Sequence, residues 1–115
     1  MNRTRIPPRA RCALVAAALA FAVAAQAQDG GKPDGKAVFT KWCAPCHGDG
    51  PGKPGTAALQ ALYKGAKPAL LEQRTDLAPQ VTKTFVRNGV SVMPFFRKTE
   101  ISDAELEALA AYLAK

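Results

Sequence analysis

The sequence is poor in the side chains that bind metal ions and carry redox chemistry. Its 115 residues include one His, three Cys, two Met and one Trp, and only 7% of them are aromatic. A single His excludes any site that needs two imidazoles, and a chain of this length excludes a multidomain enzyme. The sequence also lacks internal repeats and stretches in which apolar and polar residues alternate, so it favours an all-α fold.

Long hydrophobic runs are absent as well. The uncharged apolar stretch 12–25 has 14 residues, fewer than the roughly 18 that a membrane-spanning helix needs. Four arginines and no acid precede it, and Ala25-Gln26-Ala27 follows it as a small-residue cleavage site, an order typical of a secretory signal peptide. We therefore expect residues 1–27 to be removed after about Ala27, Cys12 with them. The remaining chain is predicted to lie in the periplasm without a membrane anchor.

The net charge of the whole chain differs from that of residues 28–115, because the predicted signal peptide is basic. Its 16 Lys and Arg against 9 Asp and Glu give a net charge of +7, which would ordinarily suggest a nucleic acid or an anionic membrane as partner. Four of the arginines lie in the predicted signal peptide, so residues 28–115 carry a net charge of only +3. We expect no nucleic acid partner.

Beyond the signal peptide, the chain divides into a polar leader at 28–33 and one domain at 34–115. The leader contains Gly and Pro and has no helical pattern. In the domain, apolar spacing, capping residues and Gly or Pro stops predict four short helices separated by long loops. Because loops this long are unusual in so small a domain, they indicate a large buried cofactor that the loops surround. The helices are expected at 34–47, 56–62, 77–88 and 102–115.

The segment Cys43-Ala44-Pro45-Cys46-His47 carries the most specific signal. Two thiols three positions apart can each bond a vinyl group of one porphyrin, and the next residue places an imidazole beneath the iron, so this sequence is a c-type haem attachment site. A lone disulfide would leave His47 unexplained. A zinc site needs two further Cys or His ligands, which residues 28–115 do not contain. A thioredoxin-like pair needs a βαβ unit, which the pattern does not show.

A second axial ligand for the iron is restricted by composition. His47 is the only His, and Met1 is lost with the signal peptide, so Met93 is the one thioether candidate. Pro94 biases Met93 toward an extended conformation within the non-helical segment 90–98, which suits an inward-pointing side chain. The alternative is that Met93 fills space in the core, as most methionines do. We predict that it is the ligand.

With these residues, 34–115 resembles a class I cytochrome c. The resemblance implies an all-α fold of about four short helices and long loops wrapped around one haem, covalently bound through Cys43 and Cys46. It also implies that the second ring nitrogen of His47 donates to a backbone carbonyl, for which Pro54 is the candidate. In this family the first and last helices pack across each other through a Gly and an aromatic residue on one and a Leu and an aromatic residue on the other; the matching positions here are Gly35 and Phe39, with Leu109 and Tyr112.

A narrower resemblance is carried by Trp42 to Gly48, Gly52 to Thr56 and above all the segment 85–100. These segments are similar to the small cytochrome subunit of p-cresol methylhydroxylase-like flavocytochromes. The resemblance implies a one-electron carrier that is no enzyme on its own, and that accepts electrons from a flavoprotein dehydrogenase subunit of the 4-alkylphenol-oxidising type and passes them to a downstream redox protein. The alternatives are a free soluble carrier of a respiratory chain and a five-coordinate haem sensor or enzyme.

Two surface features bear on the choice of partner. Phe95 and Phe96 are adjacent in a loop, so we expect one to pack inward and the other to be exposed, which would suit a stable subunit interface. A set of basic residues could instead form a rim around the haem edge for electrostatic docking, or be ordinary solvated charge. These residues are Lys53, Lys64, Lys67, Arg97 and Lys98.

Overall fold

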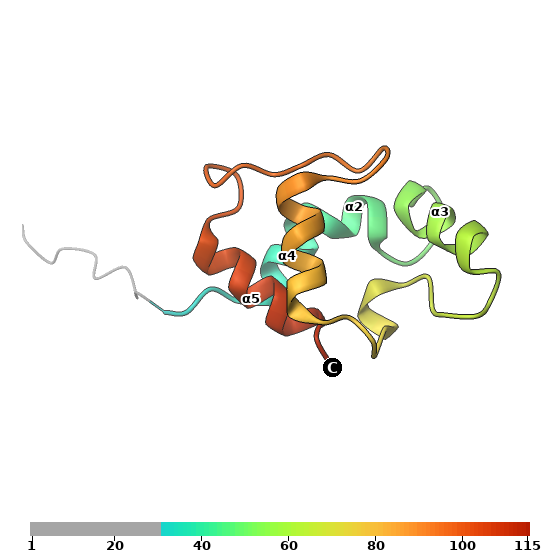
Figure 1. Cartoon of the computed structure of the whole chain (residues 1–115), viewed down its shortest axis with the longest axis horizontal. Coiled ribbons are helices and arrows are strands. Elements are labelled where there is room, and N and C mark those ends of the chain that lie inside the picture. The colour runs from blue at the N-terminus through green and yellow to red at the C-terminus, as the bar shows by residue number, and fades with distance from the viewer. Residues whose placement is uncertain (1–30) are drawn as a thin grey trace, which may run out of the picture. The chain divides into compact units, whose positions relative to one another are not determined.

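The computed structural model describes residues 31–115 (Figure 1). The predicted signal peptide at 1–27 and residues 28–30 of the predicted leader lie outside these residues. The described part is helical and contains no strand beyond one isolated bridge, which confirms the predicted all-α class. None of its helices is long and apolar enough to cross a membrane. The elements are α1 (Gly35–Val38), the π-helical turn η2 (Phe39–Cys43), α2 (Ala44–His47), α3 (Pro54–Tyr63), the 3-10 turn η3 (Leu71–Gln73), α4 (Pro79–Asn88) and α5 (Asp103–Leu113).

Most helix ends follow local signals in the sequence. Ser102 and Glu105 form the predicted capping box at the start of α5, each side chain accepting a hydrogen bond from the other's backbone N–H. Gly89 ends α4 at φ 70°, a conformation that glycine adopts without steric cost. Helices α3 and α4 each begin at a proline, Pro54 and Pro79. Helix α3 begins two residues earlier than the sequence predicted and α4 begins two residues later. In both cases the helix starts at the proline, because a residue at the first helical position needs no N–H donor.

The first and last helices cross at a glycine, as predicted. A Cβ on Gly35 would lie 2.7 Å from the Cβ of Tyr112 and would collide with the backbone of Ala108. Phe39 then packs against Tyr112 with ring centroids 6.1 Å apart, and Leu109 is fully buried beside them. The absence of a side chain at Gly35 therefore sets the distance between α1 and α5.

Helix α4 packs on α5 and holds the long loop that follows it. Val86 is buried in the common core, and the backbone N–H of Phe96 donates to the Val86 carbonyl at 2.8 Å, which satisfies an acceptor in the last turn of α4. Arg87 donates to the Phe96 carbonyl at 3.0 Å and pairs with Asp103 of α5 at 3.0 Å. The loop 90–98 is thus fixed at its far end to the scaffold.

The turn η3 is an element that the sequence did not predict. It lies between α3 and α4, and it is tied to the C-terminal end of α5 through Glu72. The Tyr112 hydroxyl donates to the Glu72 carboxylate, and the Lys115 ammonium donates to the Glu72 carbonyl. The hydrogen bond to the Glu72 carboxylate is the largest cause that raises the pKa of Tyr112 to about 12, and burial adds to it.

Candidate functional site

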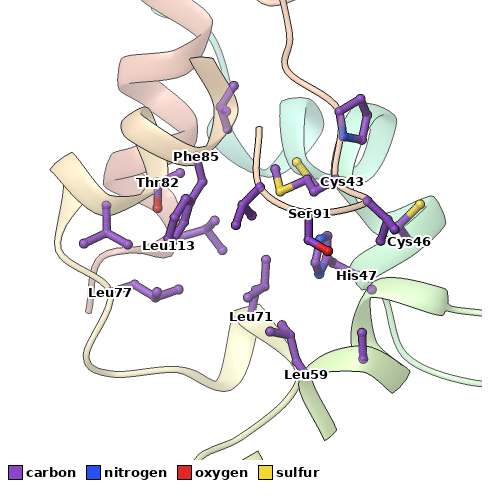
Figure 2. A pocket seen from close by; sticks show the side chains of 18 of the residues that line it. Cys43, Cys46, His47, Leu59, Leu71, Leu77, Thr82, Phe85, Ser91 and Leu113 are labelled. Carbon is purple, nitrogen blue, oxygen red and sulfur yellow. The ribbon is translucent and has the colours of Figure 1, made fainter. Parts of the chain in front are cut away.

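The helices and the loop 90–98 surround a cavity of about 610 Å³ (Figure 2). Its wall is mostly apolar, with leucines from α3, η3 and α5 and valines from α4 and the loop 90–98. The four side chains singled out from the sequence all line it: Cys43, Cys46, His47 and Met93. The structure therefore brings them to one space, although 46 positions separate Met93 from His47.

The two cysteines lie at the end of η2 and in α2. Their spacing of three residues places them one helical turn apart on neighbouring positions of the helix surface. Both are free thiols in this structure; Cys43 is half-buried and Cys46 is exposed. Burial raises the pKa of the Cys43 thiol to about 11, and the neighbouring Cys46 adds a smaller contribution of the same sign. The thiols thus sit at the wall of the cavity, one inside and one toward solvent.

The imidazole of His47 lies against the backbone of Gly55 at the start of α3. A Cβ on Gly55 would come within 2.8 Å of Nδ1 and 2.9 Å of Nε2, so glycine makes room for the ring. Burial lowers the pKa of His47, which favours its neutral form. The Thr56 hydroxyl donates to the Gly48 carbonyl at 2.9 Å and closes the loop between α2 and α3.

The expected hydrogen bond from His47 to the Pro54 carbonyl is absent. Nδ1 of His47 is buried and has no partner among residues 31–115. The reason is that Pro54 and Gly55 belong to the first turn of α3, where backbone carbonyls point along the helix toward its C-terminus and cannot face the ring. The prediction that the Pro54 carbonyl accepts a hydrogen bond from His47 was therefore wrong.

The loop that carries Met93 contains a tight turn. The backbone N–H of Val90 donates to the Met93 carbonyl at 3.1 Å, and the N–H of Met93 donates to the Val90 carbonyl at 2.9 Å. Ser91 takes φ 53° in the turn, a conformation that is uncommon for a residue with a side chain. Gly89 lies under the turn, since a Cβ there would be 2.8 Å from the Met93 carbonyl oxygen. The predicted non-helical segment 90–98 is confirmed, and its turn points Met93 at the core.

Phe95 and Phe96 behave as the sequence predicted. Phe96 packs edge-on against Trp42 with ring centroids 5.8 Å apart, whereas Phe95 is 59% exposed. Val92, at the tip of the turn, is 93% exposed. The surface beside Met93 is therefore apolar.

Three of the five basic residues proposed as a docking rim are in ion pairs. Lys67 pairs with Asp76 at 2.9 Å, Lys98 with Asp103 at 2.7 Å, and Arg97 with Glu100 at 3.6 Å. Lys53 and Lys64 have no acidic partner within the described chain. The positive charge available for electrostatic docking is thus smaller than the composition suggests.

The residues that line the cavity fit a haem. Its volume is in the usual range for a cofactor site, roughly 300–1,000 Å³, and its apolar wall suits a porphyrin ring. Two thiols one turn apart suit covalent attachment of a porphyrin, and an imidazole and a thioether are donors that the iron of a c-type haem accepts. Among the lining residues that the sequence analysis did not single out is Arg74, the only permanently charged side chain among those that line the cavity. Its position depends on the turn η3, for which the sequence holds no clear signal.

Comparison with known proteins identifies the family of this chain. A family model described as cytochrome c oxidase, cbb3-type, subunit III matches residues 31–113. One chain of a solved structure, described as p-cresol methylhydroxylase with substrate bound, is 32% identical; the match covers 72% of this chain and 92% of that one, with a TM-score of 0.49. No curated protein matches. The match over most of the chain and the helical architecture show that the chain belongs to this cytochrome c family, with the class I fold and haem c as its cofactor.

Proposed function

We propose that this protein transfers single electrons through one haem c that is bound covalently to Cys43 and Cys46 and held axially by His47 and Met93. The observation that carries the proposal is that these four side chains, from two distant segments, line the same cavity. When bound, the haem iron supplies a one-electron redox couple. The residues of the chain decide what that couple can do.

His47 and Met93 would both ligate the iron of a bound haem, which would leave no site for oxygen, peroxide or a substrate to bind it. A thioether ligand favours the reduced iron more than a second imidazole would, and this raises the reduction potential. The apolar side chains beside Met93, among them Val90 and Phe96, keep water away and act in the same direction. The chain is therefore built for electron transfer rather than for a reaction at the iron.

The test is the variant Met93→Ala in the purified haem protein. We expect it to lose the weak red-region absorption band of a Met–iron bond, to show a large fall in reduction potential, and to bind carbon monoxide when reduced. Val90→Ala, which shortens a neighbouring cavity side chain, is the matched control and should keep the band. An unchanged spectrum in Met93→Ala, or carbon monoxide binding by the reduced wild type, would mean that Met93 is not a ligand.

We also propose that the protein is the cytochrome subunit of a periplasmic flavoprotein dehydrogenase of the 4-alkylphenol-oxidising type, from which it receives electrons for a downstream redox protein. The surface next to Met93 supports this assignment: Val92 and Phe95 are exposed, and the adjacent Arg97 and Lys98 are paired with acids. Exposed apolar surface is typical of stable interfaces, whereas transient carriers rely on unpaired charge. The signal peptide predicted at 1–27 supports a periplasmic location.

A further inference from the structure

Two ion pairs connect α4 to α5. Lys83 pairs with Glu107, and one turn further along α4, Arg87 pairs with Asp103. The two pairs are alike in exposure: the cationic side chains are 25% and 22% exposed, and both acidic side chains are 63% exposed. Ion pairs this exposed contribute little to stability by themselves. A difference in function between the two pairs must therefore come from what else each pair contacts.

The second pair also holds the loop 90–98. Nη1 of Arg87 donates to the Phe96 carbonyl at 3.0 Å, and Nη2 of the same guanidinium donates to Asp103 at 3.0 Å. One guanidinium can serve both acceptors because its nitrogens lie in a rigid planar fork. Lys98, at the end of the loop, donates to the other oxygen of Asp103 at 2.7 Å. The loop is thus bonded to the start of α5 as well as to α4 (Figure 1).

Phe96 is the point at which these bonds meet the backbone of the loop. Its N–H donates to the Val86 carbonyl at 2.8 Å, so both backbone groups of this residue are bonded to α4. Its ring packs edge-on against Trp42, which directly precedes the first cysteine. Met93 lies three residues before Phe96, and Pro94 restricts the backbone between them. The position of the Met93 side chain therefore depends on how firmly Phe96 is held.

We infer, on the basis of the proposed haem site, that Arg87 is a positioning residue for the axial ligand: its bridge from the Phe96 carbonyl to Asp103 keeps the loop closed and the thioether of Met93 directed at the iron. The turn of Val90 and Met93 bonds the loop only to itself. Without the bridge, the bond from the Phe96 N–H would be the one hydrogen bond left between the loop and α4 in the described chain. The thioether would then leave the iron more often.

The experiment measures how often Met93 leaves the iron, by titration of the oxidised haem protein with imidazole. Added imidazole can bind only when the thioether has left, so its apparent affinity is its intrinsic affinity multiplied by the fraction of protein with an open loop. Loss of the weak red-region band of the Met–iron bond reports the binding. Removal of one hydrogen bond from a charged donor should raise the open fraction by about tenfold or more.

We expect Arg87→Gln to bind imidazole about tenfold more tightly than the wild type. Lys83→Gln is the matched control and should keep the wild-type affinity, because it breaks the other ion pair between the same helices. A merely structural role of Arg87 gives a different result: both variants would unfold at a slightly lower denaturant concentration, and neither would change the imidazole affinity. Far-UV circular dichroism of the same samples measures the global unfolding.

Equal imidazole affinities of Arg87→Gln and Lys83→Gln would overturn the inference. If Arg87→Gln fails to fold, Asp103→Asn and its control Glu107→Gln make the same comparison from α5. The inference then requires tighter imidazole binding by Asp103→Asn, and equal affinities would overturn it. Failure of the proposed function is distinguishable, since the wild type would then lack the Met–iron band before any imidazole is added. A wild type without that band would overturn both proposals.

Discussion

At the scale of single residues, the contact between His47 and Gly55 decides how the imidazole is held. The ring lies against Gly55, and its buried Nδ1 has no hydrogen-bond partner in the described chain. Packing against α3 therefore fixes the orientation of the ring, which a hydrogen bond to Nδ1 would otherwise help to fix. This makes the absence of a side chain at Gly55 important for the site.

We predict that Gly55→Ala destabilises the protein by about 1–3 kcal/mol, the usual cost of inserting a methyl group into a filled space. In an open helical position the same change would stabilise by about 1 kcal/mol, so the sign is informative. Thermal unfolding of the haem protein measures it. Thr56→Ala, which removes only the bond to Gly48, is the control and should cost about 1 kcal/mol. A stabilised Gly55→Ala variant would show that the ring does not rest on Gly55.

Tyr112 gives a prediction for alkaline pH. Its pKa is raised from 10.0 to about 12, first by the hydrogen bond that its hydroxyl donates to Glu72. A raised pKa means that the protonated form is favoured in the folded state, so this stability is fully present below pH 10 and is lost as the pH rises toward 12. We expect the stability difference between wild type and Tyr112→Phe to shrink over that interval. Denaturant unfolding from pH 8 to 12 tests this, and a constant difference would contradict it.

At the scale of elements, the crossing of α1 and α5 depends on Gly35. We predict that Gly35→Ala costs about 2–3 kcal/mol, because the added Cβ collides with Ala108 and Tyr112 and the two helices must separate. Lys36→Ala, an exposed change in the same helix, should be close to neutral. Unfolding by denaturant compares the two variants. Equal stabilities would mean that the helices adapt to the added methyl group.

The elements also show what the sequence predicts well and where it falls short. The capping box at Ser102, the stop at Gly89 and the helical turn of Cys43 and Cys46 depend on neighbours in the chain, and all three are present in the structure. The turn η3 and the place of Arg74 depend on contacts between distant segments. Elimination of the other thioethers, together with the local signals of Pro94 and the non-helical segment 90–98, predicts Met93 as a ligand, and Met93 lines the cavity.

At the scale of the whole molecule, the proposed function makes the surface around Met93 the expected contact for a partner. We predict that the protein copurifies with a flavoprotein and that the complex resists high salt, because Val92 and Phe95 supply an apolar contact while nearby charges are paired within the chain. The double change Val92→Ser and Phe95→Ser should release the partner and leave the haem spectrum intact. Leu62→Ser, at an exposed leucine of α3, is the control and should retain it.

A free carrier would give a different pattern. It would purify as a monomer, and its reduction by several donors would slow as salt increases, through the unpaired Lys53 and Lys64. In that case the double variant would leave the reduction rates unchanged. Size-exclusion chromatography at two salt concentrations separates the two possibilities.

The π-turn η2 has a consequence for recognising related chains. It lies between α1, where Gly35 meets α5, and α2, which carries the second cysteine. A π-turn holds one residue more than an α-turn within an otherwise continuous helix. A relative with one residue fewer between the glycine and the cysteines can therefore keep the helix crossing and the two thiols in the same orientation on an uninterrupted α-helix. A one-residue gap at this turn, in an alignment of homologues, marks a change of helix type and preserves both the crossing and the thiols.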